Sequence, residues 1–344
     1  MKRLSALRAA LVAGALLVGL NARAWDYEVH RFINQLALAS LPEDFPAFVR
    51  DAAARERIAF LSGEPDRWRN TPDLALRHCN GPDHFLDLED LAKFGLAPEQ
   101  LSPFRYEFVA QLTRGRLAHP QNFPVTDPAR DLDATRHLPG FLPWTITEQY
   151  SKLKSAFSYL KEYEAAGTPE EIANARENLV YVMGVMGHFV GDAAQPLHTT
   201  RHYNGWVGPN PNRFTTNRTF HGWIDYGFLQ QSGMRTNELF ARIRPAQRPW
   251  PQGELGHTNA FPEMLAYVVE QSKLVEPLYR LEKDGKLARG GQDLDAGREF
   301  LSAQLVKAGQ MLGNLWLAAW QEAPRDSFLQ RELAKRKGLS NGRK

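Results

Sequence analysis

The chain has 344 residues and a mass of 38.9 kDa, with 43% hydrophobic and 24% charged residues, which is enough to fold around a large core. Its single cysteine, Cys79, excludes an internal disulfide framework and a thiolate metal site, so any bound metal must take nitrogen and oxygen ligands. The formal net charge of +3 gives no support for strong binding to duplex nucleic acid.

Residues 1–24 are predicted to be a signal peptide. A basic start, "MKRLSALR", precedes "AALVAGALLVGL", which is too short to span a bilayer, and small residues stand at positions 22 and 24. Cleavage after Ala24 would make Trp25 the mature N-terminus, in the periplasm or outside the cell. A short membrane anchor is the alternative, but no second apolar segment follows. Cleavage removes four bases and no acid, leaving 38 bases against 39 acids.

Helical periodicity dominates the rest of the chain. It predicts helices over 28–41, 145–167, 168–194, 260–285 and 294–323. Thr168 is the expected N-cap of the third helix, with Pro169 in its first turn. Alternating β-branched runs are absent from the sequence, so no sheet is expected beyond a small hairpin. These features predict an all-α fold with a single domain over 25–328 and a basic, disordered tail over 329–344.

Two long irregular stretches, 66–90 and 199–220, interrupt the predicted helices. Loops of this length in a compact domain usually carry function or are disordered. Both stretches contain side chains that can bind a metal, which favours function.

The segment "GHFVGDAAQPLH" (187–198) continues an apolar helix and contains three polar groups that are costly to bury alone. His188 and Asp192 are four residues apart and therefore share a helix face, and His198 follows Pro196, where the helix must end. "FHGWID" repeats the spacing with His221 and Asp225. Such pairs can be internal hydrogen-bonded pairs or metal ligands.

Further candidate ligands stand earlier in the chain: Asp66 in "SGEPDRWRN", His84 in "PDHFLDLED" and His30 in "WDYEVH". The amine of Trp25, with an ordinary pKa of about 7.7–8.0, could also bind a cation together with its own carbonyl oxygen. Imidazole and carboxylate without sulfur suit zinc best, with manganese or iron as weaker alternatives. Nine ligand groups, at roughly four per ion, indicate two or three ions. Scattered polar groups without a metal are the alternative.

The chain resembles the zinc-dependent single-strand-specific nucleases, which share an all-helical fold with the bacterial zinc phospholipases C. The resemblance covers most of the mature chain. It rests on five segments in the order of that family: "WDYEVH", "DRWR", "DHFLD", "HFVGDAAQPLH" and "FHGWID".

The resemblance implies three zinc ions. One would be held by Asp66, His84, His188 and Asp192. A second would be held by Trp25, through its amine and carbonyl, with His30 and the other oxygen of Asp192. The third would be held by His198, His221 and Asp225.

Three more residues match the active site of the family. Arg69 would bind the phosphoryl oxygens, Asp87 would orient Arg69 or the attacking water, and Phe85 falls in the substrate pocket. Without the resemblance, Arg69 reads as a surface arginine and Asp87 as a loop acid beside Glu89 and Asp90.

The implied activity is zinc-dependent endonucleolytic hydrolysis of single-stranded DNA or RNA by a monomer, with 3′-nucleotidase activity left open. The 23-residue gap from His198 to His221, and Asp225 in place of a glutamate, favour this branch. The aromatic residues near the ligands could stack unpaired bases, line an acyl pocket or pack the loop: Phe85, Tyr203, Trp206 and Phe214.

Two other functions are alternatives. One is a zinc phospholipase C acting on phospholipid head groups. The other is a non-catalytic periplasmic zinc-binding protein. The third ion argues against it, because three protein ligands leave a position for water, as in catalytic zinc sites.

Overall fold

The computed structural model describes residues 27–250 and 260–341, so the predicted signal peptide and Trp25 lie outside the described residues. The described part of the chain is all-α, as predicted: it contains helices and two isolated β-bridges but no strand. The helices are α1 (Tyr27–Ser40), α2 (Ala52–Leu61), α3 (Glu64–Arg69), α4 (Leu74–Asn80), α5 (Arg105–Ala118), α6 (Leu142–Ala166), α7 (Pro169–Ala194), α8 (Phe220–Gly222), α9 (Phe228–Gln231), α10 (Thr236–Phe240), α11 (Phe261–Ser272), α12 (Val275–Lys283), α13 (Asp295–Glu322) and α14 (Ser327–Asn341).

Helix α7 begins where the sequence predicts. Thr168 caps it and Pro169 occupies the first turn. The Thr168 side chain accepts a hydrogen bond from the backbone N–H of Glu171 at 3.3 Å, and the Glu171 carboxylate accepts one from the backbone N–H of Thr168 at 2.8 Å. This reciprocal capping box satisfies backbone donors that a helix start leaves open.

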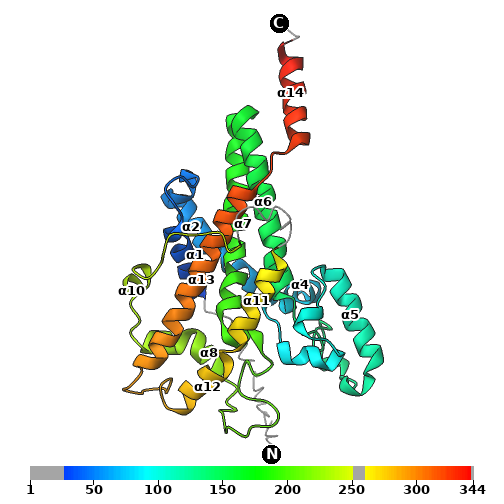
Figure 1. Cartoon of the computed structure of the whole chain (residues 1–344), viewed down its shortest axis with the longest axis vertical. Coiled ribbons are helices and arrows are strands. Elements are labelled where there is room, and N and C mark those ends of the chain that lie inside the picture. Colours follow the sequence, from blue (N-terminus) through cyan, green and yellow to red (C-terminus); the bar gives the residue numbers. More distant parts are fainter. Residues whose placement is uncertain (1–26, 251–259, 342–344) are drawn as a thin grey trace, which may run out of the picture.

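Helix α7 is the central element of a bundle that it forms with α1, α2, α6 and α13 (Figure 1). Every residue from 183 to 194 is buried. Two glycines allow α1 to approach this half of α7. A Cβ atom on Gly187 would lie 1.7 Å from Oδ1 of Asn34, and one on Gly191 would lie 2.9 Å from Nδ1 of His30. The close packing therefore places His30 of α1 against the end of α7.

The end of α7 continues into a short 3₁₀ helix, η7 (Pro196–Thr199), which lies beside another, η2 (Gly81–His84). The backbone N–H of Leu86 donates to the carbonyl of His198 at 2.9 Å, and Leu86 also forms an isolated bridge with Gly140. These contacts hold the segment after His84 against the end of the bundle.

Several elements differ from the sequence prediction, and α2 and α5 lie outside the five predicted helices. The predicted helix 260–285 is two helices, α11 and α12, because Pro277 lacks an N–H and would clash with the preceding turn of a continuous helix; it lies in the first turn of α12 instead. The stretch 66–90, predicted to be irregular, contains most of α3 and all of α4.

The prediction of a disordered tail over 329–344 is corrected for the residues that the structure describes, because α14 covers Ser327–Asn341. Leu333 is buried, and Arg336 forms a bidentate ion pair with Glu171 at 2.7 Å and 2.9 Å. This charged segment thus packs against α6 and is joined to the start of α7 by the ion pair.

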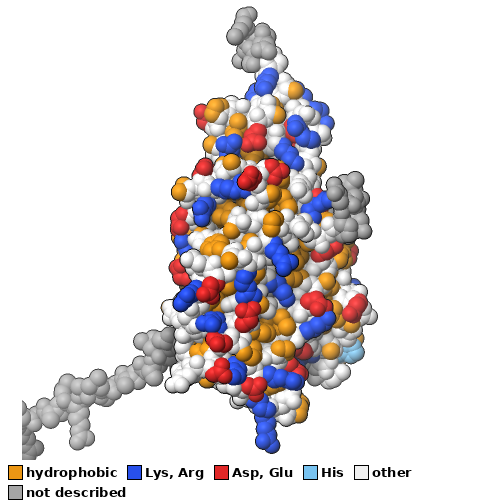
Figure 2. Space-filling model, turned by 60° about the vertical axis from the view of Figure 1, so that its left-hand side comes forward, with side chains coloured by type: hydrophobic (Ala, Val, Ile, Leu, Met, Phe, Trp, Pro, Cys, Tyr) orange, Lys and Arg blue, Asp and Glu red, His pale blue; other side chains and the backbone are white. Residues whose placement is uncertain are grey.

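Across the described residues, none of the helices combines the length and the apolar character needed to cross a membrane. On the face that Figure 2 shows, acidic and basic side chains are interspersed over the described surface. This mixture agrees with the small net charge of the sequence.

Candidate metal centre

The structure brings the predicted ligands of the first ion together from three elements. His188 lies on α7, Asp66 on α3 and His84 at the end of η2. Nε2 of His188 lies 2.9 Å from Nδ1 of His84 and 3.9 Å from Oδ1 of Asp66. One ligand atom from each of the three residues lies within 4.8 Å of the others, a separation that a shared metal ion can span.

The ligands predicted for the second ion also converge, apart from Trp25, which lies outside the described residues. Nε2 of His30 lies 3.5 Å from Oδ1 of Asp192, and the rings of His30 and His188 stack with centroids 3.9 Å apart. His30, His188 and Asp192 form a second group whose ligand atoms lie within 4.8 Å of one another. His188 therefore borders both groups, although the family pattern assigns it to the first ion only.

The third predicted set is buried but less closely grouped: among the described residues it is not one of the groups whose ligand atoms all lie within 4.8 Å of one another. Nε2 of His221 lies 3.1 Å from Oδ2 of Asp225, and the rings of His198 and His221 are 5.0 Å apart. His221 lies on α8, and Asp225 lies in a π-helical turn, η8 (Trp223–Gly227). Such turns occur often at functional sites.

The carboxylate of Asp192 lies close to four imidazoles of the cluster. Its Oδ2 lies 2.9 Å from Nδ1 of His84 and 3.3 Å from Nε2 of His188, and its Oδ1 lies 3.5 Å from both Nε2 of His30 and Nδ1 of His198. The two oxygens thus face different imidazoles. A carboxylate in this position can bridge two cations.

Several ligand atoms are buried without a hydrogen bond from any described residue. They are Nδ1 and Nε2 of His30, Nε2 of His84, Nε2 of His198, both ring nitrogens of His221, Oδ1 of Asp66, Oδ1 of Asp192 and Oδ2 of Asp225. Two of these oxygens have an ionisable neighbour, since Oδ1 of Asp66 lies 2.8 Å from Nε of Arg69 and Oδ2 of Asp225 lies 3.1 Å from Nε2 of His221. A buried polar atom without a partner costs about 1–3 kcal/mol, so the rest of the group still calls for a ligand. Nitrogen and oxygen donors without sulfur match zinc, and the residues fit the metal that the sequence predicts.

Backbone carbonyls orient two of the imidazoles. Nδ1 of His188 lies 2.7 Å from the carbonyl oxygen of Ser62, and Nδ1 of His198 lies 2.6 Å from that of His84. When Nδ1 donates its proton to a carbonyl, Nε2 keeps its lone pair, and this tautomer is the one that binds a metal.

The electrostatics differ between the predicted ligands. Burial raises the pKa of Asp225 well above its usual range, and Asp192 outweighs burial to raise the pKa of His188, so both hold a proton more readily than usual. Three other ligands are shifted toward metal-binding forms. Burial, together with neighbouring His188, lowers the pKa of His30 to about 4, and burial with nearby Arg69 lowers the pKa of His84 to about 3. Burial opposes the charge on Asp192, but His198 and His188 outweigh it and hold its pKa well below the usual range. At neutral pH, His30 and His84 are neutral and Asp192 is charged.

A cavity of about 290 Å³ opens beside the third set of ligands. It is lined by Arg69, Asn70, Phe85, Asp87, Leu197, His198, Tyr203 and His221. The structure therefore places Arg69, Asp87 and Phe85, all selected from the sequence, in one cavity with two of the predicted ligands.

Two of these cavity residues have distinct charge environments. Nε of Arg69 lies 2.8 Å from Oδ1 of Asp66, and the Arg69 charge holds the pKa of Asp66 at about 2 against the effect of burial. Burial, Asp90 and Glu89 raise the pKa of Asp87 well above its usual range. The cavity thus offers a fixed cation and a carboxyl group that retains a proton more readily than usual.

Two of the four aromatic residues selected from the sequence line the cavity, and two do not. Phe85 and Tyr203 line the cavity, and Tyr203 is 46% exposed. Trp206 stacks on His202 outside this cavity, and Phe214 is buried beneath Trp206. Only the first two can contact a substrate in the cavity.

Sequence reasoning missed two polar residues of the site. Asn70 lines the cavity, and Gln195 donates a hydrogen bond from Nε2 to Oδ1 of Asp225 at 2.6 Å. Both adjoin selected residues, since Asn70 follows Arg69 and Gln195 lies between Asp192 and His198. The position of Asn70 and Gln195 within the motifs could have identified them, but neither side chain is a typical zinc ligand.

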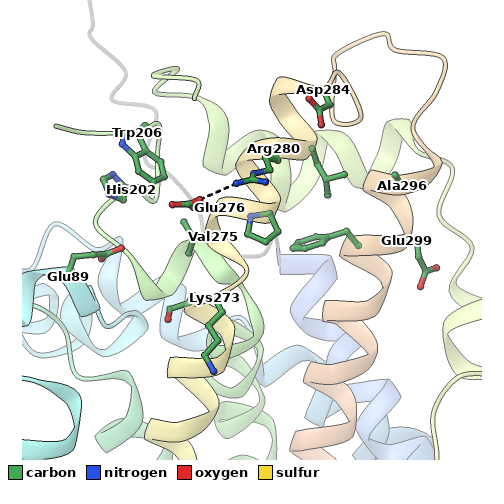
Figure 3. Close-up of a pocket in the computed structure, with 14 residues that line it drawn as sticks. Glu89, His202, Trp206, Lys273, Val275, Glu276, Arg280, Asp284, Ala296 and Glu299 are labelled. Atoms are coloured by element: carbon green, nitrogen blue, oxygen red, sulfur yellow. Dashed lines mark ion pairs between the residues drawn. The ribbon is translucent and has the colours of Figure 1, made fainter. Parts of the chain in front are cut away.

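A larger and more open groove of about 1220 Å³ lies along α12 and α13 (Figure 3). Trp206 and His202 form one wall, and Arg280 pairs with Glu276 at 3.7 Å. The groove carries charges of both signs and contains none of the predicted metal ligands. It is not the metal centre.

Comparison with known proteins gives little information. No protein-family model matches the chain, and no curated protein matches its sequence. Among solved structures, alpha toxin from Clostridium absonum is 13% identical with a TM-score of 0.44, covering 89% of this chain and 66% of the toxin. Alpha-toxin from Clostridium perfringens avian strain SWCP is 15% identical with a TM-score of 0.39, covering 89% of this chain and 67% of the toxin. The chain spans about two-thirds of the length of these toxins, and likenesses this low say nothing about its site.

Proposed function

We propose that the chain is an exported, zinc-dependent hydrolase that cleaves phosphodiesters, with single-stranded nucleic acid or nucleotides as its substrate. One observation carries the proposal. Asp192 lies among four buried imidazoles, and ligand atoms without hydrogen bonds surround it next to a cavity that holds an arginine.

The residues that would hold the metal are the ligands predicted from the sequence, of which the first two sets form close groups in the structure. Asp66, His84, His188 and Asp192 would hold one ion, His30 and Asp192 a second with Trp25, and His198, His221 and Asp225 a third. Bound zinc acts as a Lewis acid and lowers the pKa of a coordinated water to about 7.

The protein itself would position the phosphodiester. The guanidinium of Arg69 carries a permanent positive charge and presents donors suited to phosphoryl oxygens. Its contact with Asp66 ties this cavity residue to the first set of predicted ligands. Arg69 would therefore bind the substrate anion and stabilise charge that develops on its oxygens.

Asp87 would take part in proton transfer. Its pKa is raised by burial and by two neighbouring acids, and it shares the cavity with Arg69. A carboxyl group whose pKa is shifted toward neutrality is suited to hold a proton for the departing oxygen.

Tyr203 and Phe85 favour an unpaired nucleobase as the adjoining part of the substrate. Tyr203 is half-exposed beside His221, with ring centroids 5.8 Å apart. A base can stack on such a ring without sequence readout.

A zinc phospholipase C is the second candidate. Leu197 and Phe85 give the cavity an apolar wall that suits an acylglycerol, and the same metal chemistry would cleave a phospholipid head group. The choice between the two substrates belongs to experiment.

The decisive assay compares two substrates with one preparation. The processed protein, loaded with zinc, is given single-stranded DNA or RNA and, in parallel, phosphatidylcholine vesicles, before and after removal of zinc with a chelator. We expect turnover of the single-stranded nucleic acid, its loss on chelation and its return with added zinc.

The control is Asp51→Asn, an exposed carboxylate without a side-chain capping bond, which should behave as the wild type. Cleavage of the phospholipid alone would establish the second candidate. Full zinc loading without turnover of either substrate would indicate a non-catalytic zinc-binding protein.

A further inference from the structure

Gln195 is a buried residue that none of the three predicted ligand sets includes. It lies between α7 and η7, with its side chain fully buried. Its backbone N–H donates to the carbonyl of Asp192 at 3.0 Å, and its carbonyl accepts from the N–H of His198 at 2.9 Å. Gln195 is therefore fixed by its backbone to residues from two ligand sets.

The side chain of Gln195 reaches the third set from another part of the chain. Its Nε2 donates to Oδ1 of Asp225 at 2.6 Å, and its Oε1 accepts a weaker bond from the N–H of Leu197 at 3.4 Å. Because the amide is bound on both sides, its orientation is determined. The donor group can only point toward Asp225.

This bond leaves the other oxygen of Asp225 facing the predicted metal position. Oδ2 lies 3.1 Å from Nε2 of His221 and has no hydrogen bond from the described residues. A carboxylate can rotate about its terminal bond, but the Gln195 donor holds one oxygen away from the site. Hydrogen bonds from outside the metal–ligand bonds orient carboxylate ligands in this way.

The π-helical turn that carries Asp225 is held at a second point. Nε1 of Trp223 donates to the carbonyl of Leu287 at 2.7 Å, and the guanidinium of Arg289 lies over the Trp223 ring at 4.3 Å. Trp223 thus fixes the backbone of the turn, whereas Gln195 acts on the carboxylate itself.

We infer that Gln195 is a positioning residue for the third zinc ion, which it acts on through Asp225 and not by direct contact. The inference rests on the proposed function, since it concerns an ion of that metal centre. It predicts that loss of the Gln195 donor weakens one ion and leaves the other two in place.

The test measures zinc binding directly. Zinc-free protein is titrated with Zn²⁺ against a chromophoric chelator, which gives the number of ions and the dissociation constant of each. In Gln195→Leu, we expect one ion to bind about 10- to 100-fold more weakly, the usual effect of removing such a partner. The other two constants should be unchanged, and excess Zn²⁺ should restore any turnover.

A second variant and a control separate positioning from a structural role. Gln195→Glu keeps the size of the side chain and the acceptor for Leu197, but its carboxylate cannot donate to Asp225, so it should lose the same ion. Gln111→Leu is the matched control, because Gln111 also bonds backbone groups on both sides, to Gln100 and Ser102, but on α5. It should bind zinc as the wild type does.

Each result decides the inference. Three ions in the wild type with unchanged constants in both Gln195 variants would overturn the inference and leave the proposed function standing. Equal weakening of all three ions, with a lower melting temperature of the zinc-free variants, would assign Gln195 a structural role instead. A wild type that binds no zinc would overturn the proposed function, and the inference with it.

Discussion

Asp192→Asn tests the centre of the metal cluster, because one carboxylate serves two predicted ions. In the structure its Oδ2 faces His84 and His188 at 2.9 Å and 3.3 Å, and its Oδ1 faces His30 at 3.5 Å. Asparagine keeps the size of the side chain but removes the charge and replaces one oxygen by a donor that cannot bind a cation. Both ions should therefore weaken together.

The magnitude follows from the ligand count. A four-ligand zinc site binds with about 10–16 kcal/mol, so one ligand contributes roughly 2.5–4 kcal/mol, which is a factor of about 10² to 10³ in the dissociation constant. With free zinc at about 1,000 times the wild-type constant, each site stabilises the fold by about 4.1 kcal/mol. The weaker constant lowers this contribution by roughly 3–4 kcal/mol for each of the two ions.

Two measurements check this expectation. Elemental analysis after gel filtration counts the ions, and thermal unfolding with and without zinc gives the zinc-dependent stabilisation. Asp51→Asn, the same substitution at an exposed position, is the control. Wild-type zinc content and wild-type stabilisation by zinc in Asp192→Asn would refute the bridging role of Asp192.

Three further predictions concern other parts of the molecule. Arg69→Lys should lower kcat/KM by about 10²- to 10³-fold, the effect of losing one well-placed donor to a developing anion, while the zinc content stays at three ions; unaltered kcat/KM would remove Arg69 from the reaction. Blocking the amine that cleavage after Ala24 frees, by one added residue before Trp25, should weaken one ion in the chelator titration, and three unchanged constants would take Trp25 off the ligand list. The Arg336 side chain and the Thr168 N–H lower the pKa of Glu171 to about 2, below the ordinary 4.5, so the contribution of this pair to stability is complete above pH 4.5 and is lost as the pH falls toward 2. Protease cleavage within α14 should increase over that range in the wild type but much less in Arg336→Gln, and an equal acid response in both would show that the pair does not hold the helix.

The sequence by itself determined the all-α class, the longest helices and the donor chemistry. The start of α7 follows from Thr168, Pro169 and Glu171, which act within a few residues of one another. The helix over 295–322 follows from local periodicity. The pairing of His188 with Asp192 follows in the same way, because residues four apart share a face of a helix. The single cysteine excluded a thiolate site, so the predicted ligands carry nitrogen and oxygen.

Only the tertiary structure decided how the predicted ligands come together. Asp192 meets His84 across 108 positions of the chain, and that distance depends on how η2 packs against the end of α7. The closeness of His30 depends on glycines of α7 that let α1 approach, and the bond from Gln195 to Asp225 depends on a π-helical turn. Periodicity describes neighbours along one helix, whereas these contacts arise from side-chain packing between helices, which no local pattern records.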